Sequence, residues 1–538
     1  MMKIYKKNIC GVALGLALLL PLSCSEDFLE KNDTSNASES ALFKKPSDGI
    51  FLVNAIYDTF HDVDFMLKAL WYQANFLTQD FRNWGSDTFF ENYNVDAGFD
   101  PLNIFWTRSY QGIARANSAI PIIAKMKAEG VIDETLANRL TGEAYFLRGV
   151  FYYYLAANFG GVPLELQTVT DDGRHPRNTQ DEVFAAVEAD MKTAAGLLPW
   201  KEDLASADLG RATKGAAIAY QGAAQMWLKK YSEAVTVFNQ LEGKYQLMEN
   251  FLDIHEYDKQ NNKESIFEVQ FLAGADNSWG HANETHWLTS FGMPEEVTNF
   301  GYHYAAKELY DAFVPGDLRK RATVIGPGEV HPSPAISINK YPKVISGYND
   351  PDPAIKANYT GADGRIINTV GTVARPWKGS NGNQPRSGYY SVKTWRDPNT
   401  TGATGTPENI FSGQNAIMMR FGEVLVSKAE AQFRAGDIAG AAATLQRVRD
   451  RGFGKLTTPS VVVPALQGTN VLKNILDEYR FELSGEFSVW FDLRRSGEHI
   501  NFVKEKYNKT VTPGKDIMPI PAKQIAINPT LEQNEAYR

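Results

Sequence analysis

The sequence predicts a mainly α-helical protein, in which tetratricopeptide-like helical hairpins form a scaffold with long, loop-rich insertions. Three observations lead to this fold class. Apolar residues recur at helical spacing in many segments after residue 46. Two segments far apart in the sequence repeat one helix–break–helix pattern. The sequence between them is rich in Gly, Pro, Asn and Thr and has no sustained period, which is typical of loops.

Residues 1–23 have the parts of a bacterial lipoprotein signal peptide. Three lysines lie within the first seven residues, residues 9–22 are uncharged and largely apolar, and a small serine precedes Cys24. This apolar core is short for a membrane span and suits a signal peptide. We therefore expect cleavage before Cys24 and lipidation of its sulfur. Pro21 departs from the usual leucine, and the alternative is an ordinary secretory signal followed by a chance cysteine.

The mature chain is expected to begin with a flexible tether, residues 24–45, because this segment is polar and rich in Ser and Asn. Removal of the signal peptide takes away its three lysines and changes the formal net charge from −8 to −11. This acidity argues against nucleic acid or an anionic membrane surface as the main partner, since both favour clusters of Lys and Arg. With Cys24 as the only remaining cysteine, the mature chain forms no internal disulfide.

Residues 46–538 are expected to form a single body, with the helical scaffold in residues 46–273 and 414–500. Its first helix presents Ile50, Val53 and Tyr57 on one face. A second helix, which stops at Gly160-Gly161, has an apolar stripe made of Leu147, Val150, Phe151, Tyr154 and Leu155. A third stripe, near the C-terminus, consists of Leu472, Ile475, Leu476, Tyr479 and Leu483. The tail from residue 518 is expected to be extended because of Pro519 and Pro521.

The two hairpin-like segments are residues 214–241 and 420–448. A shift of 207 residues aligns Ala234 with Ala441 and Phe238 with Leu445. Alanines at the crossing point let two helices approach closely, and the larger residues are then free to pack on the next pair. Because the repeats are too far apart for a tandem array, other material must be inserted between them.

This inserted material, residues 274–413, is expected to be the loop-rich part that carries the ligand site. Long irregular insertions on a rigid scaffold are usually functional. The segment also holds four tryptophans, Trp279, Trp287, Trp377 and Trp395.

Five segments, taken together and in this order, resemble the SusD/RagB family, the surface-exposed glycan-binding lipoproteins of Bacteroidetes-type bacteria. They are EAYFLRGVFYYYLAANFGGVPL, TKGAAIAYQGAAQMWLKKYSEAV, RFGEVLVSKAEAQFRAGD, YRFELSGEFSVWFDLRRSG and MPIPAKQIAINPTLEQN. The resemblance covers most of the chain from about residue 46 to the end.

The resemblance implies a protein that captures an oligosaccharide or polysaccharide and delivers it to a SusC-like TonB-dependent outer-membrane transporter. It places the chain at the cell surface, anchored in the outer membrane by lipid on Cys24, and the acidic residues that follow fit that location. Family members are not enzymes, and no cofactor is expected. The glycan itself is not specified, because ligand contacts in the family vary with the glycan.

Two alternatives remain open at this stage: a surface glycosidase, and an accessory for transporter assembly with little glycan affinity. The chain contains no GxSxG, HExxH or GxxxxGK[ST] motif, but sequence does not give the separation of carboxylate pairs on which glycoside hydrolysis depends. His281 and His286 are spaced five apart, which is wrong for one helical face, so we expect no metal site there. No EF-hand pattern supports calcium.

Sugar binding needs an exposed aromatic ring, on which the C–H groups of a sugar stack, and fixed polar partners for its hydroxyls. Residues 79–94 offer this mixture, with Trp84 in a Gly/Ser turn. The other expected ligand contacts are Arg82, Asn83, Asp87, Trp279, Trp287, Trp377, Arg386 and Tyr389. The structural alternative is that these side chains only fix their loops to the body.

Two further groups of residues are expected to be structural. Four tryptophans that lie in apolar helical patterns are assigned to the core: Trp71, Trp106, Trp227 and Trp490. Four charged residues near the C-terminus are assigned to a paired network: Glu482, Glu486, Arg494 and Arg495.

Overall fold

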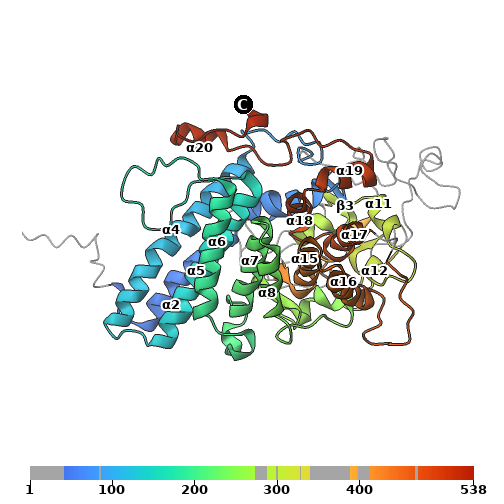
Figure 1. Ribbon diagram of the computed structural model, residues 1–538, viewed down its shortest axis with the longest axis horizontal. Coiled ribbons are helices and arrows are strands. Elements are labelled where there is room, and N and C mark those ends of the chain that lie inside the picture. Colours follow the sequence, from blue (N-terminus) through green and yellow to red (C-terminus); the bar gives the residue numbers. More distant parts are fainter. Residues whose placement is uncertain are drawn as a thin grey trace, which may run out of the picture.

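The computed structural model describes residues 42–83, 87–272, 288–298, 301–326, 329–339, 388–397, 412–466 and 470–538. Helices dominate these residues, and the strands are short (Figure 1). The predicted mainly α-helical fold class is therefore confirmed.

The first half of the scaffold is a row of helices in which each packs on the next (Figure 1). In chain order these are α4 (Asp100–Ala128), α5 (Glu134–Phe159), α6 (Gln180–Leu197), α7 (Lys214–Trp227) and α8 (Tyr231–Asn239). Helix α2 (Pro46–Tyr57) covers α4 and α5. The stripe predicted in residues 147–155 lies on α5 and is buried, and α5 ends at Gly160, whose φ of 77° favours glycine.

The two repeated segments form hairpins that pack against each other. Helices α15 (Phe421–Arg434) and α16 (Ile438–Gly452) make the second hairpin, and α15 lies against both α7 and α8. In two pairs of positions that the 207-residue shift equates, Ala234/Ala441 and Phe238/Leu445, all four residues are buried. Within the first hairpin, a Cβ at Gly222 would lie 2.3 Å from the ring of Phe238, so only glycine allows this crossing.

A two-stranded ribbon explains how hairpins so far apart in sequence become neighbours. Strand β2 (Ser265–Val269) pairs antiparallel with β6 (Ala416–Arg420), which leads directly into α15. The chain therefore leaves the scaffold after β2 and returns beside it at β6, with the insertion closed at its base.

The described part of the insertion consists of short elements. The helices are α9 (Leu288–Gly292), α10 (Glu295–Thr298), α11 (Lys307–Ala312) and α12 (Arg319–Thr323). The strands are β3 (His303–Ala305), β4 (Val324–Ile325) and β5 (Tyr390–Ser391). Before α4, the chain forms the 3₁₀ turn η2 (Asp58–Phe60), the π-helix η3 (Asp64–Trp71), helix α3 (Tyr72–Phe76) and strand β1 (Phe81–Asn83). Further 3₁₀ turns lie between α6 and β2: η4 (Lys201–Asp203), η5 (Ser206–Asp208), η6 (Phe251–Ile254) and η7 (Tyr257–Lys259).

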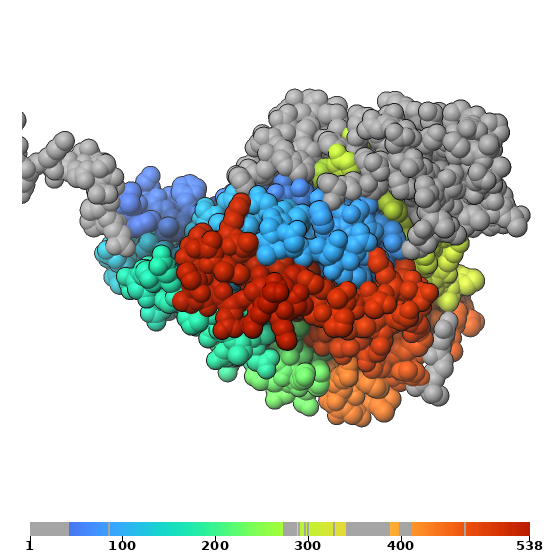
Figure 2. Space-filling model, turned by 90° about the horizontal axis from the view of Figure 1, so that it is seen from above, coloured from blue at the N-terminus to red at the C-terminus, as the bar shows by residue number. Residues whose placement is uncertain are grey.

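The C-terminal part adds α17 (Val471–Leu483), α18 (Val489–Ser496) and α19 (His499–Tyr507). The expectation of an extended tail was wrong in part, because the tail contains helix α20 (Ala522–Ile527) and the 3₁₀ turn η8 (Glu535–Tyr537). Pro521 stands at the N-cap of α20, where its lack of an N–H and its fixed φ are compatible with a helix start. The C-terminal part of the chain lies against segments of its first half (Figure 2). The Met518 N–H donates to the Asn158 carbonyl at 2.9 Å.

The core assignment of the tryptophans is confirmed for Trp71, Trp106 and Trp490, which are buried. Trp227 is partly buried and stacks on Phe184, with ring centroids 4.8 Å apart. None of the described helices combines the length and the apolar character that a bilayer-spanning segment requires.

Candidate functional site

Three segments to which the sequence assigned ligand contacts meet at their described ends. Strand β1 pairs antiparallel with β3, so that Arg82 faces Tyr304 and Asn83 faces His303. The Ala305 N–H donates to the Tyr389 carbonyl at 2.9 Å, so Tyr389, the residue just before β5, lies next to β3. We call this meeting point of β1, β3 and residue 389 the strand junction. Residues 83, 303 and 389, which belong to the three predicted segments, therefore meet at this junction.

The sequence-predicted contacts at the junction are mostly buried. The exposed fractions are 8% for Arg82 and 3% for Asn83, whereas Asp87 is partly buried. Tyr389 is 2% exposed and packs on Tyr310 with ring centroids 5.0 Å apart, so its ring serves packing here and offers no open stacking face. The remaining predicted contacts lie outside the described residues: Trp84, Trp279, Trp287, Trp377 and Arg386. Cys24, His281 and His286 also lie outside them.

Buried charged residues contact β1 and hold it in place. The Arg82 guanidinium lies 3.8 Å from the Glu91 carboxylate, and the Asn83 N–H donates to the same carboxylate at 3.4 Å. Lys509 donates to the Gln79 side chain at 3.0 Å and to the Glu91 carbonyl. Burial raises the pKa of Glu91 to about 7 and lowers the pKa of Lys509 to about 8. Within the described residues, Nε and Nη2 of Arg82 are buried and have no hydrogen-bond partner.

An aromatic cage fixes β3, and sequence reasoning missed it. The His303 ring is 1% exposed and stacks on Trp71 at 4.8 Å between ring centroids, with Tyr72 edge-on at 4.9 Å. Phe76 and Phe291 complete the cage. Burial holds the pKa of His303 well below its usual value, so the ring is neutral. Neither ring nitrogen has a hydrogen-bond partner in the described part of the chain. No sequence signal marked this histidine, because three of its four cage residues, Trp71, Tyr72 and Phe76, lie over 200 residues earlier in the chain.

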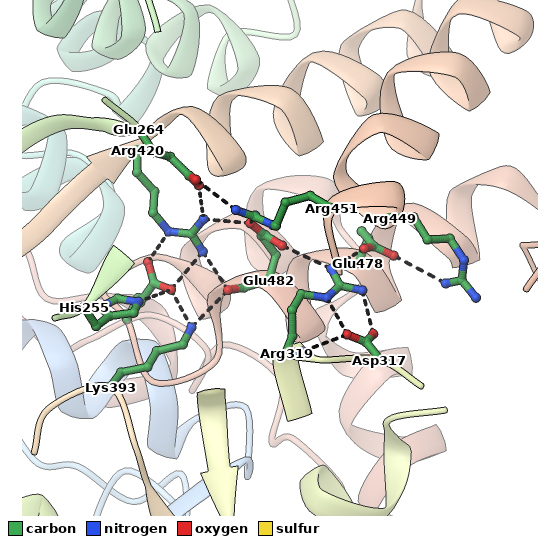
Figure 3. Close-up of polar contacts among 11 residues, drawn as sticks. His255, Glu264, Asp317, Arg319, Lys393, Arg420, Arg449, Arg451, Glu478 and Glu482 are labelled. Atoms are coloured by element: carbon green, nitrogen blue, oxygen red, sulfur yellow. Dashed lines mark hydrogen bonds and ion pairs between the residues drawn. The ribbon is translucent and has the colours of Figure 1, made fainter. Parts of the chain in front are cut away.

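A buried network of charges connects the scaffold to the base of the insertion (Figure 3). Arg420 lies at its centre and donates at 2.7 Å to each of three carboxylates, those of Glu264, Glu482 and Glu486. Lys393, which follows β5, donates to Glu486 at 2.5 Å and to the Glu482 carbonyl at 3.0 Å. The predicted structural role of Glu482 and Glu486 is confirmed.

The same network extends along α17. Arg451 bridges Glu264 and Glu482, and Arg319 joins Asp317 to Glu478 and Glu482. Burial alone would raise the pKa of Glu486, but Arg420 and Lys393 hold it well below its usual range, so this carboxylate is ionised. The pKa of Lys393 falls to about 8 because of burial, which Glu486 partly offsets.

The other two predicted network residues are also structural. Arg495 donates to Glu430 at 2.9 Å and to Asp492 at 3.1 Å. Arg494 lies 5.1 Å from the ring centroid of Trp227 and donates to the Asp516 carbonyl at 3.5 Å. The charged residues after residue 477 therefore stabilise the fold through buried ion pairs and hydrogen bonds.

Comparison with known protein families decides the relationship of the chain. The model of the SusD family matches residues 263–537, which is half of the chain. The chain belongs to the SusD family. A second SusD-like model, described as starch-binding and associating with the outer membrane, matches residues 27–228. This family consists of binding proteins, so the chain is not an enzyme.

Individual SusD relatives are similar along nearly their whole length. SusD-like protein P38 of Formosa agariphila is 25% identical, with 99% of each chain covered. A solved laminarin-binding SusD-like protein has a TM-score of 0.69 at 21% identity, covering 92% of this chain and 100% of its own. Surface glycan-binding protein A of Bacteroides thetaiotaomicron, solved with laminarihexaose, has a TM-score of 0.68 at 19% identity, covering 91% and 99%. At these identities the solved structures establish the shared fold.

Proposed function

We propose that this SusD-family chain is a cell-surface lipoprotein that binds a glycan at the strand junction and its attached loops and delivers it to a SusC-like TonB-dependent transporter. The observation that supports the site is the convergence of β1, β3 and residue 389. The three segments that have the aromatic and polar residues expected of a sugar site each have described residues at this junction. Capture requires no chemistry: an aromatic ring stacks on the sugar and polar side chains bind its hydroxyls.

The rigidity of the junction also supports a binding role. The caged His303 and the buried Arg82–Glu91 pair leave the strand ends little freedom. A fixed base lowers the entropy that loops lose when they close on a ligand, and this increases affinity. Laminarin is the first glycan to test, because similar solved structures bind laminarin or laminarihexaose.

Isothermal titration against laminarin and a panel of other purified polysaccharides tests the site. We expect Trp84→Ala to weaken binding at least tenfold, as loss of a stacking ring of roughly 1.5 kcal/mol implies. Trp200→Ala is the matched control, since this tryptophan lies on the far scaffold between α6 and α7. Equal affinities for both variants would refute the site, and a release of reducing ends from the bound glycan would refute the pure binding role.

The anchor and the partner have separate tests. Cys24→Ser should move a folded, glycan-binding protein from the membrane fraction to the soluble fraction. Affinity purification of the wild-type protein from outer membranes should retain a TonB-dependent transporter. If every loop aromatic can be replaced without loss of growth on the glycan while the transporter is still retained, an assembly role replaces glycan capture.

A further inference from the structure

A polar groove of about 420 Å³ is lined by residues of α11, α16, α17 and α19. These helices lie on the side of the molecule away from the α4–α6 end of the helix row (Figure 1). The volume of the groove lies in the range of small-molecule sites. None of its lining residues belongs to β1, β3 or β5. Arg480 in its wall donates to Asp80 at 2.8 Å, so the groove is fixed to the segment that leads into β1.

The strongest indication of a ligand is the side chain of Asn474. It is 7% exposed and lines the groove, and its carboxamide makes no hydrogen bond to any residue that the structure describes. Its backbone N–H donates to the Asn470 carbonyl at 3.2 Å. The carboxamide atoms of Asn474 are not among the described side-chain atoms that are closed off from solvent, so its two donors and one acceptor are open to the groove. A ligand or water in the groove would satisfy them.

A second lining residue has an unused polar atom. Oε2 of Glu308 on α11 is buried and has no hydrogen-bond partner in the described part of the chain. Burial raises the pKa of this carboxyl above its usual value. The free carboxyl oxygen can accept a hydrogen bond from a hydroxyl group.

The other charges in the wall are already paired. Asp477 lies 2.6 Å from Lys506, and Glu478 binds Arg319. Five lining residues are acidic and three are basic, which disfavours an anionic sugar: Glu308, Asp311, Asp477, Glu478 and Glu505 against Arg449, Arg480 and Lys506.

An aromatic ring supplies the apolar component. Phe481 lines the groove and packs on Phe313 with ring centroids 5.0 Å apart, which holds its ring in place. A partly buried ring beside an unpaired amide and carboxyl is the combination by which proteins bind uncharged sugars.

We propose that this groove is a second glycan subsite, which binds a neutral sugar unit through Asn474, Glu308 and the ring of Phe481. The inference rests on the proposed glycan-binding function and adds to it a site outside the loops. A glycan held at both places is bound more tightly than at either alone, because the second contact is intramolecular.

The test is titration of the full-length mature protein with laminarihexaose, maltohexaose and cellohexaose, with Asn474→Ala as the main variant. The expected result is two sugars bound per chain, of which Asn474→Ala weakens one about tenfold through the loss of its hydrogen bonds. Asn239→Ala, an exposed helix asparagine on α8, is the matched control and should change neither. Hydrogen exchange in residues 471–483 should slow with sugar even in the Trp84→Ala protein.

The outcomes separate the two proposals. A single sugar per chain, with Asn474→Ala equal to Asn239→Ala and no added protection of residues 471–483, overturns the subsite and leaves the loop site intact. Absence of binding for every oligosaccharide and polysaccharide tested overturns both. If Asn474→Ala lowers the melting temperature enough to prevent titration, Glu308→Gln, which keeps the shape of the side chain, replaces it with the same expected loss.

Discussion

Replacement of Arg420 by methionine is the sharpest test of the buried charge network. Arg420 is fully buried and donates to the carboxylates of Glu264, Glu482 and Glu486, each at 2.7 Å. Methionine keeps much of the volume and removes the charge. The three carboxylates would then lack the positive charge of Arg420 in a site that water does not reach, and a buried negative charge without a compensating cation is unfavourable.

The expected cost follows from what remains. Glu264 keeps Arg451 at 2.8 Å, and Glu486 keeps Lys393 at 2.5 Å. No carboxylate becomes wholly unpaired, but the summed charge is left one positive unit short. Removal of one partner from a buried ion pair typically costs about 3–5 kcal/mol, and we expect Arg420→Met to fall in this range. This is a large share of a total stability of roughly 5–15 kcal/mol.

Arg447→Met is the matched control. Arg447 makes a similar paired contact with Glu242 at 2.8 Å, but its side chain is 47% exposed. Exposed pairs contribute about 0–1 kcal/mol, so the control should be nearly neutral. The assay is urea unfolding followed by circular dichroism at pH 7. Equal unfolding free energies for the two variants would refute the assignment of the network to stability.

Three further predictions concern the strand junction and the helical hairpin. Glu91→Gln should be more stable than wild type above pH 7, by up to about 3 kcal/mol, and equally stable below pH 4. The pKa of Glu91 is about 7 in the folded protein against an ordinary 4.5, so the stability of the wild type falls as the pH rises between these two values. A difference in urea unfolding free energy that does not change with pH would contradict this. His303→Phe should raise the unfolding free energy by about 1 kcal/mol, because it removes buried ring nitrogens that have no partner in the described residues. Thermal unfolding of this variant beside His303→Ala measures the effect, and an equal loss of stability in both variants would argue against the aromatic cage. Gly222→Ala should destabilise the first hairpin by about 1–3 kcal/mol, since the new Cβ would lie 2.3 Å from the Phe238 ring. Gly196→Ala is the control in the same thermal assay, because a Cβ there meets no atom within 4 Å.

Arg420→Met also has a consequence for binding. Lys393 lies two residues after β5, and its bonds to the Glu482 carbonyl and the Glu486 carboxylate connect the insertion to α17 and the residues that follow it. If the network only stabilises the fold, glycan affinity of the folded variant should stay close to wild type. A loss of affinity without unfolding would indicate that the network also positions the loops.

The sequence by itself determined the helical scaffold and its repeat. Apolar periodicity is a local property, so the stripe of α5 and the paired positions Ala234/Ala441 could be read without knowledge of their partners. The end of α5 at Gly160 was also marked locally, because glycine readily adopts the positive φ that ends a helix. The family resemblance also followed from contiguous segments, each read within itself.

The tertiary structure decided what depends on pairs of distant segments. Nothing local in the sequence pairs β1 with β3, places His303 among helix aromatics or groups Glu264, Arg319 and Arg420 around α17. Arg82 and Tyr389 are residue types that often contact sugars, but in the folded protein their neighbours bury them. Asn474 had no signal at all, because an asparagine in an amphipathic helix is ordinary until the elements opposite it leave its amide unpaired. Composition fixes which contacts a side chain can make, and only the fold fixes which partners lie within hydrogen-bond reach.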